Sequence, residues 1–345
     1  MKNYHKVLIV LSIFLIPITS TLASNVYEIK LPDVPKVEAV VPEPITLKVT
    51  GSTSKTNKEI LEELNRDKSI KFSNHKAPVY YEHKEDSSKV AKVGEIFNGK
   101  VTAFLHTTYM EQNKVIDILQ KAGFEILASL PIDKKGFATS IVFTNDEILK
   151  ASTKINRGFA STLRVTIDKK NRLVSITNPI FFMNAFMQDD YDKKLALRTL
   201  STLRDAFKDL KNSDEQLKFR ILKRYQFMKG LPKYMDMTTI KKGNMHTLLQ
   251  KARESNKVVY EKALSVDSTI IGVKLGSRTT KFVKKIGYQN AGLLPYPVLI
   301  EGGEVKILDP KYYIAIMYPM LKMSQFMTIA TTPGAIHKDI DKIFR

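Results

Sequence analysis

The sequence predicts an α+β protein built from two tandem homologous units, each a small, mainly antiparallel sheet with packed helices. Apolar residues alternate between strand spacing and helix spacing, and the whole pattern recurs after about 130 residues. A length of 345 residues accommodates two domains, and 43% hydrophobic with 26% charged residues is typical of folded proteins. Low contents of Gly, Pro and Cys exclude collagen-like, low-complexity and disulfide-stapled proteins.

Residues 1–23 have the features of a cleaved signal peptide. Lys2 and Lys6 precede an apolar run at 7–18, which is shorter than the roughly 20 residues that a membrane-spanning helix needs. Ala23 then provides a small residue at a cleavage site. We therefore expect an exported, periplasmic protein whose mature chain has no transmembrane span. A retained N-terminal anchor is the alternative.

Residues 24–90 are predicted to form a spacer with irregular structure, because their four closely spaced prolines favour extended polyproline II. Positive charge is concentrated beyond the spacer, where residues 101–345 hold 40 Lys and Arg against 23 Asp and Glu, an excess of 17. Such an excess attracts anionic partners, and export excludes nucleic acid from among them. The four prolines are Pro32, Pro35, Pro42 and Pro44.

Internal similarity divides the remaining chain. The sequence Leu-Gln-Lys-Ala at 119–122 recurs at 249–252. Asn178-Pro179 and Asp309-Pro310 each combine an Asx cap with a proline in the first helical turn, a typical start of a helix. The predicted parts are a first α+β repeat at 91–212, a basic helical connector at 213–243 and a second α+β repeat at 244–345.

Each repeat is expected to contain a helix, two strands, a second helix, a hairpin and the helix that begins at the Asx-Pro pair. Thr144 and Glu147 predict a capping box for the second helix of the first repeat, and Ser277 and Thr279 open its counterpart. Gly302-Gly303 predicts a tight turn in the second hairpin. The predicted strands are 124–130, 140–143, 163–168 and 173–177 in the first repeat and 257–266, 269–273, 296–301 and 305–308 in the second.

Two amphipathic helices are expected between the repeats. The first has apolar residues at helical spacing from Ala196 to Leu210, and the second from Leu217 to Met228. We interpret both apolar stripes as packing faces. The second helix also carries four cations that form a candidate surface for a partner: Lys218, Arg220, Lys223 and Arg224.

A known family shares part of this pattern. The shared sequence features are a helix that ends in Ala122-Gly123-Phe124, a strand that ends in Ile-Val-Phe-Thr-Asn-Asp at 141–146, and a hairpin at 163–178. In these features the stretch 115–178 resembles the family called domain of unknown function 302. The second repeat keeps the hairpin and lacks the Gly-Phe pair. The resemblance implies a small α+β fold and no particular activity.

No motif for catalysis, for a metal or for a cofactor occurs. Without Cys, thiol catalysis and Cys-ligated zinc are excluded. The histidines of the mature chain stand alone, and neither a G-x-S-x-G elbow nor a P-loop is present. The acidic cluster Asp189, Asp190 and Asp192 lies between two predicted helices, where carboxylates commonly cap a helix or face solvent.

The turn at 276–281 is the candidate ligand site. It follows a predicted strand and opens a helix, so that free amides, hydroxyls and cations can converge on an anion. A plain helix cap with basic neighbours is the alternative interpretation. The candidate residues are Lys274, Ser277, Arg278, Thr279, Thr280 and Lys281.

The leading functional expectation is a non-enzymatic module that binds a ligand or a partner of the cell envelope. One alternative is an enzyme or binder for an anionic small molecule at the 276–281 turn. Another is a structural assembly subunit in which the two repeats form a pseudo-dimer within one chain. No cofactor and no oligomeric state are predicted.

Overall fold

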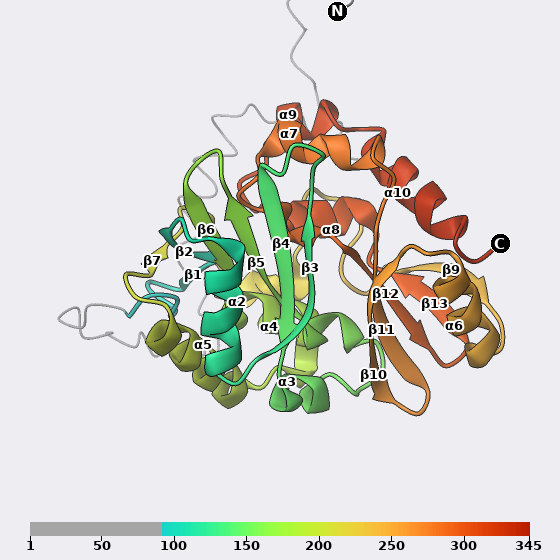
Figure 1. Cartoon of the computed structure of the whole chain (residues 1–345), viewed down its shortest axis with the longest axis horizontal. Coiled ribbons are helices and arrows are strands. Elements are labelled where there is room, and N and C mark those ends of the chain that lie inside the picture. The colour runs from blue at the N-terminus through green and yellow to red at the C-terminus, as the bar shows by residue number, and fades with distance from the viewer. Residues whose placement is uncertain (1–91) are drawn as a thin grey trace, which may run out of the picture. The chain divides into compact units, whose positions relative to one another are not determined.

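Two large antiparallel sheets, one two-stranded sheet and the covering helices form the part of the chain that the structure describes (Figure 1). The structure is a computed structural model, and it describes residues 92–345. The predicted signal peptide (1–23) and spacer (24–90) lie outside these residues. The α+β class and the antiparallel character of the sheets are confirmed.

The first sheet has the strand order β3-β4-β5-β6-β2-β7, and each neighbouring pair is antiparallel. Helix α2 packs on β3 and β4 and buries Val115 and Leu119 there (Figure 1). The bounds are β2 Phe104–Thr108, α2 Gln112–Lys121, β3 Glu125–Pro131, β4 Ala138–Thr144, α3 Asp146–Ala151, β5 Leu163–Asp168, β6 Leu173–Thr177, α4 Pro179–Met187, α5 Lys193–Ala206 and β7 Lys211–Asn212.

The second sheet has the order β10-β11-β12-β13-β9, again antiparallel throughout. A separate two-stranded sheet joins β1 (Lys100–Thr102) to β8 (Gln216–Lys218). The remaining bounds are β9 Thr238–Lys242, α6 Met245–Glu254, β10 Val258–Ser265, β11 Ser268–Val273, α7 Phe282–Ile286, β12 Tyr296–Glu301, β13 Glu304–Ile307, α8 Pro310–Met317, α9 Met323–Met327 and α10 Thr332–Asp341.

The two sheets share one topology. The series β2-α2-β3-β4-α3-β5-β6-α4 has the same order of helices and strands as β9-α6-β10-β11-α7-β12-β13-α8. The five strands of each series also occupy equivalent places in their sheets. Asn178 and Asp309 cap the last helix of each series, accepting hydrogen bonds from the amides of Ile180 (3.0 Å) and Lys311 (2.8 Å), as predicted.

The two halves pack reciprocally through equivalent short turns. The 3-10 turn Gly158–Ser161 of the first half contacts β11 and β12, and the turn Ala291–Leu293 of the second half contacts β4 and β5. Both turns place a glycine against the other sheet. A Cβ atom on Gly158 would lie 2.4 Å from Leu299 Cδ1, and one on Gly292 would lie 2.7 Å from Thr166 Oγ1. The absence of a side chain at both glycines therefore permits the close approach of the halves.

One continuous core unites both halves. Helices α4 and α8 meet within it, where the rings of Phe186 and Tyr313 lie 6.2 Å apart. Tyr234 joins this contact, stacking on Phe186 at 5.8 Å and meeting Tyr312 edge to face at 6.1 Å. Each half also has a pair of adjacent aromatic residues in this core, at 181–182 and at 312–313.

A row of polar side chains crosses the first sheet between the halves. His106, Ser175, Thr166 and Ser140 are direct cross-strand partners on β2, β6, β5 and β4, so they share one face. The three hydroxyl residues are buried, and His106 is half-buried. Burial lowers the pKa of His106 below its usual 6.5, although Glu215 and Asp214 act in the opposite direction.

The structure corrects the predicted connector. Leu217 lies in β8 opposite Val101, and a 3-10 helix at Phe219–Arg224 replaces the expected amphipathic helix. Ile221 and Met228 are exposed, so the apolar spacing did not mark a single packing face. Strand β9 is an edge of the second sheet, which moves the start of the second half from 244 to 238.

Two predicted helix caps are also wrong. Asn145, and not Thr144, caps α3 by accepting a hydrogen bond from the Ile148 amide at 2.9 Å. Thr144 is the buried end of β4, and its hydroxyl donates to the Ser161 carbonyl at 2.6 Å. In the second half neither Ser277 nor Thr279 caps α7, which follows a 3-10 turn at Thr279–Lys281.

We predict that Gly292→Ala lowers the free energy of unfolding by about 1 to 3 kcal/mol, because its methyl group would collide with Thr166 in the tightly packed contact between the halves. Urea unfolding followed by circular dichroism measures the change. Gly334→Ala in α10 is the matched control, since no atom lies within 4 Å of its new methyl group. Equal stability of Gly292→Ala and the parent protein would contradict the packing described above.

We also predict that stability falls as the pH decreases below 6.5. The pKa of His106 in the folded protein lies below the value of 6.5 at which the unfolded chain binds a proton, so acidification favours unfolding. Between pH 7 and pH 5, His106→Asn should reduce this loss by up to about 1 kcal/mol. Urea unfolding at several pH values tests it, and parallel stability profiles of the two proteins would contradict it.

Candidate functional site

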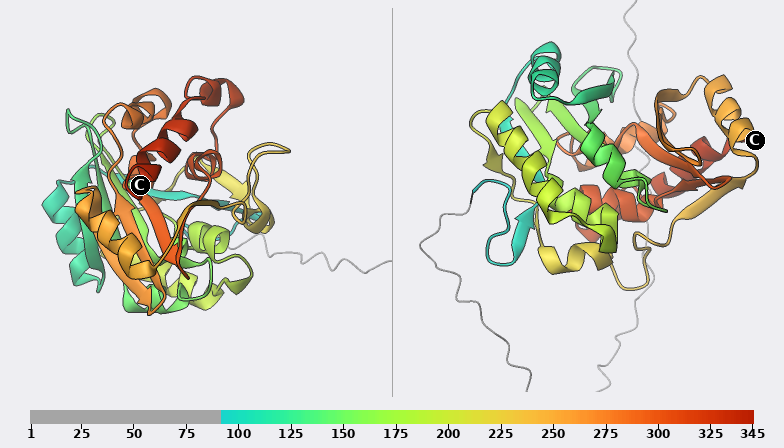
Figure 2. Two further views of the ribbon diagram at one scale, coloured as in Figure 1. Left: turned by 90° about the vertical axis from the view of Figure 1, so that its right-hand side faces the viewer. Right: turned by 90° about the horizontal axis from the view of Figure 1, so that it is seen from below.

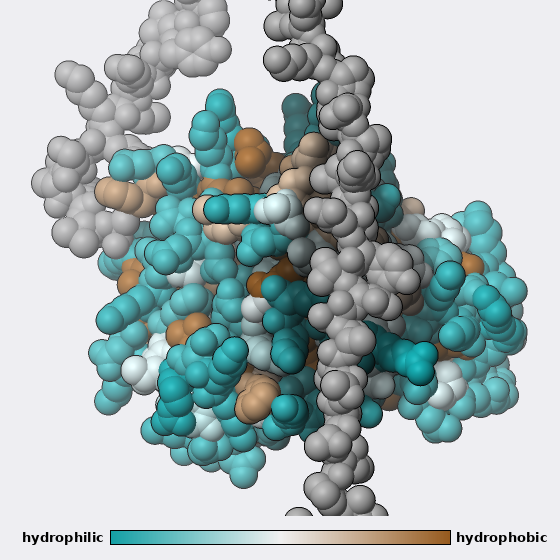
Figure 3. Space-filling model, turned by 90° about the horizontal axis from the view of Figure 1, so that it is seen from above, coloured by the Kyte–Doolittle hydropathy of each residue, from teal (hydrophilic) through white to brown (hydrophobic). Residues whose placement is uncertain are grey.

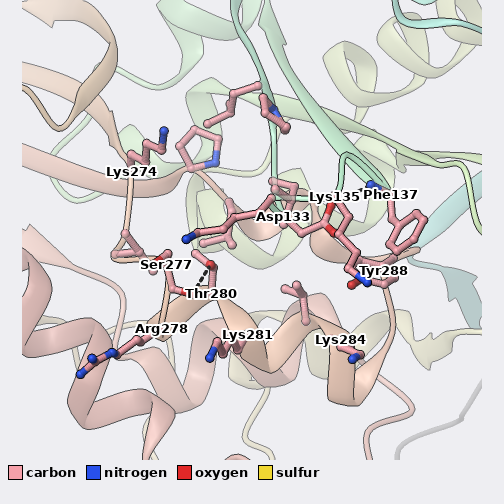
Figure 4. Close-up of a pocket in the computed structure, with 18 residues that line it drawn as sticks. Asp133, Lys135, Phe137, Lys274, Ser277, Arg278, Thr280, Lys281, Lys284 and Tyr288 are labelled. Carbon is pink, nitrogen blue, oxygen red and sulfur yellow. Dashed lines mark hydrogen bonds between the residues drawn. The ribbon is translucent and has the colours of Figure 1, made fainter. Parts of the chain in front are cut away.

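A cavity of about 700 Å³ lies where the two halves meet (Figure 4). The first half contributes the β3–β4 loop, and the second half contributes the segment from the end of β11 through α7 together with residues just before β12. The lining residues are Leu130, Pro131, Ile132, Asp133, Lys134, Lys135, Phe137, Lys274, Leu275, Ser277, Arg278, Thr280, Lys281, Val283, Lys284, Tyr288, Leu294 and Pro295.

The charge of this lining is strongly positive. Six cations face a single carboxylate, Asp133. None of these six cations forms a salt bridge with a carboxylate of residues 92–345. The cavity therefore carries positive charge that these residues do not compensate. The six cations are Lys134, Lys135, Lys274, Arg278, Lys281 and Lys284.

The β3–β4 loop holds its shape through Asp133. Its Oδ1 atom accepts hydrogen bonds from the amides of Phe137 (2.8 Å) and Ala138 (3.3 Å), so the one carboxylate of the cavity is committed to the loop. Gly136 supplies the positive φ of 65° that the turn requires. Phe137 then reaches the other half, with its ring 6.4 Å from that of Tyr288.

The cavity also has a substantial apolar wall. Leu275, Val283 and Leu294 from the second half are buried beside it, and Ile132 lies opposite in the loop of the first half. Burial raises the pKa of Tyr288 above its usual value of 10.0, and the negative charges of Asp133 and Asp168 raise it further. The Tyr288 hydroxyl is therefore neutral at pH 7. Cations beside an apolar wall suit a ligand that has both an anionic group and an apolar part.

Five of the six predicted anion-site residues line this cavity. Lys274, Ser277, Arg278, Thr280 and Lys281 do so, and Thr279 does not. Figure 4 shows the 277–281 turn across the cavity from Asp133, with the Arg278 side chain extending away from that carboxylate.

Two donors of this turn bind an anion that the chain itself supplies. Asp339 Oδ2, on α10, accepts hydrogen bonds from the Gly276 amide (2.9 Å) and the Thr279 hydroxyl (2.6 Å). The Thr280 amide donates to the Gly276 carbonyl at 3.1 Å. The Gly276 and Thr280 amides and the Thr279 hydroxyl are thus already hydrogen-bonded within the chain, whereas the side chains of Lys274, Arg278 and Lys281 line the cavity.

The part of the cavity wall that the β3–β4 loop contributes was not predicted from the sequence. Lys134, Lys135 and Phe137 belong to a loop between two predicted strands, and Lys284 and Tyr288 follow the predicted turn. The sequence Asp-Lys-Lys-Gly at 133–136 could have indicated this basic loop. The corresponding connection in the second half, between β10 and β11, has only two residues, Val266 and Asp267.

The predicted partner surface is not one helical face. Lys218 lies on β8, whereas Arg220, Lys223 and Arg224 lie on the following 3-10 helix. Lys223 forms a salt bridge with Asp189 at 3.2 Å. None of the four residues lines the cavity.

The acidic cluster at 189–192 is structural, as expected. Hydrogen bonds from Lys154 (2.6 Å) and Arg157 (2.8 Å) lower the pKa of Asp190. Asp192 caps α5 by accepting from the Lys194 and Leu195 amides. Within residues 92–345, no group of three His, Cys, Asp or Glu side chains is placed to hold a metal ion.

Comparison of the chain with protein-family models, with curated proteins and with solved structures finds no match. Across residues 92–345, the helices are all too short or too polar to cross a membrane.

We predict that Asp339→Asn lowers the free energy of unfolding by about 2 kcal/mol, because it weakens two hydrogen bonds that the carboxylate accepts from the 276–279 turn. Chemical denaturation provides the measurement. Asp341→Asn, which removes an exposed ion pair with Arg345, is the control and should cost less than about 1 kcal/mol. Equal losses for the two variants would contradict a special role for Asp339.

Proposed function

We propose that this protein is an exported, non-enzymatic binding protein of the cell envelope, and that its ligand is an amphiphilic anion held in the cavity between the halves. The observation that carries the proposal is the set of six cations around one cavity, without a carboxylate partner among residues 92–345. Clustered like charges repel one another, and an anion between them relieves the repulsion.

The chemistry of the lining defines the ligand class. Lysine ammonium groups bind phosphate or carboxylate as point charges, and five of the six cations are lysines. The apolar wall around Leu275, Val283 and Leu294 gains stability by burying hydrocarbon. A phosphate or carboxylate attached to an alkyl or aromatic group satisfies both parts of the site.

We further infer that the two halves arose by tandem duplication. The inference is supported by the shared element series, the shared strand order and the matched caps Asn178 and Asp309. We also propose that residues 1–23 are a signal peptide and that the protein is periplasmic. Its membership of the domain of unknown function 302 family is likewise a proposal. All three rest on features of the sequence.

An enzymatic role is not favoured by the groups around the cavity. General acid or base catalysis by a carboxylate or an imidazole requires such a group near the substrate. Among the described residues that line the cavity there is no His, and the single carboxylate, Asp133, accepts two backbone hydrogen bonds within its own loop.

The test is isothermal titration calorimetry of the full mature chain with octyl phosphate, octanol and octyltrimethylammonium below their micelle concentrations. We expect saturable binding of octyl phosphate alone. Lys134→Gln with Lys135→Gln should weaken it about tenfold or more, because two of the cations are removed. Lys193→Gln with Lys194→Gln, an equal change of charge at the exposed start of α5, should leave it unchanged.

Equal affinity for octyl phosphate and octyltrimethylammonium, or equal loss in the two double variants, would overturn the proposal. Native mass spectrometry of the protein purified from its source at low salt gives an independent test. A retained anionic mass below about one kilodalton is expected for a cavity of this size.

A further inference from the structure

The surface formed by α7, α9 and the loop before α9 combines exposed methionines with lysines. We propose that this surface, termed the α7–α9 face, docks the protein on an anionic lipid bilayer. The proposal concerns an external surface next to the cavity, and the face shares Lys281 and Lys284 with the cavity lining. The tests below therefore change residues of the face that do not line the cavity. The α7–α9 face consists of Lys281, Lys284, Lys285, Met320, Lys322, Met323 and Met327.

Three methionines of this face are exposed although each is strongly apolar. Met320 is 59% exposed, Met323 36% and Met327 63%. Met323 and Met327 are four residues apart on α9 and therefore lie on one side of the helix. Figure 3 views the molecule from above, the end where Figure 1 places α7 and α9, and shows apolar residues interspersed among hydrophilic ones.

The face is firmly held to the fold. Lys285 Nζ donates to the Thr328 carbonyl at 2.8 Å and thereby joins α7 to the end of α9. Tyr318 donates its hydroxyl hydrogen to the Gly287 carbonyl at 2.6 Å. Phe326, on the buried side of α9, packs against Phe227 with ring centroids 5.4 Å apart. The exposed methionines therefore project from an anchored support.

Positive charge surrounds these methionines without acidic residues in the same segments. From 268 to 300 the chain has five cations and no Asp or Glu, and from 310 to 338 it has three cations and no Asp or Glu. Such a surface repels a second copy of itself and attracts a negative one.

Lipid is the partner that suits both parts of the face. Flexible, polarizable methionine side chains pack against irregular apolar partners, and acyl chains provide such a partner. Lysines next to them reach the headgroups of an anionic leaflet, at about 1 kcal/mol for each cation near the surface. An acidic protein partner would pair with the lysines, but it would also need a specific apolar groove to cover the exposed methionines.

The test is sedimentation of the full mature chain with vesicles of phosphatidylcholine, with and without about 30 mol% phosphatidylglycerol. We expect binding to the anionic vesicles alone, reduced about tenfold or more in 0.5 M salt. The triple variant Met320→Gln, Met323→Gln, Met327→Gln should weaken binding about tenfold or more, and Lys322→Gln alone about fivefold, because it removes one cation and leaves the Lys285 contact in place.

Two controls separate this proposal from the cavity. Ile155→Gln, Met235→Gln, Val266→Gln removes three exposed apolar side chains outside the face and should bind vesicles like the parent protein. Lys134→Gln with Lys135→Gln, which changes the cavity, should also bind vesicles normally.

Several results would overturn the proposal. One is equal affinity for neutral and anionic vesicles, and another is no binding to anionic vesicles. A third is an equal loss of vesicle affinity in the two triple variants. A triple methionine variant that alters only self-association in analytical ultracentrifugation, with vesicle binding intact, would assign the face to a protein contact instead.

Discussion

The reciprocal seating of two short turns is the constraint on which the rest of the structure depends. Each half inserts one 3-10 turn against the sheet of the other half, and each turn places a glycine, Gly158 or Gly292, where an added Cβ atom would lie within 3 Å of a side chain of that sheet. Neither half can then shift without opening both contacts. The aromatic residues of α4 and α8 consequently share one core, and the edges of the two halves are brought together to form the cavity.

Equivalent topology does not give equivalent sites, because the connecting loops differ. The cavity needs the loop between β3 and β4, whose Asp133 fixes the turn and whose Lys134 and Lys135 supply charge. At the equivalent place in the second half, two residues join β10 to β11. At the place in the first half that corresponds to the 276–281 turn, Asn145 is followed by Asp146 and Glu147, and these two carboxylates would repel an anion. The shared framework thus supports the proposed anion site at one junction only.

Local patterns predicted most of the fold, and contacts distant in sequence explain the errors. The Asx-Pro starts at 178 and 309 involve neighbouring residues only, and both form as expected. The helix expected at 217–228 does not form, since Leu217 pairs with Val101, far away in the chain. The turn at 276–281 could be recognised as basic, but its amide and hydroxyl partner is Asp339, 63 residues after Gly276. Such pairings depend on tertiary structure and leave no trace in hydrophobic periodicity.

The hydrogen bonds that Asp339 accepts have a consequence for selectivity. They occupy the Gly276 amide and the Thr279 hydroxyl, and the cations that line the cavity are chiefly lysine ammonium groups on long, rotatable stems. Ammonium groups distinguish poorly between a planar carboxylate and a tetrahedral phosphate, whereas rigid amides and guanidinium forks discriminate by geometry. A ligand held as we propose would therefore be one of a series of related molecules, sorted by charge and hydrocarbon size and not by the shape of the headgroup.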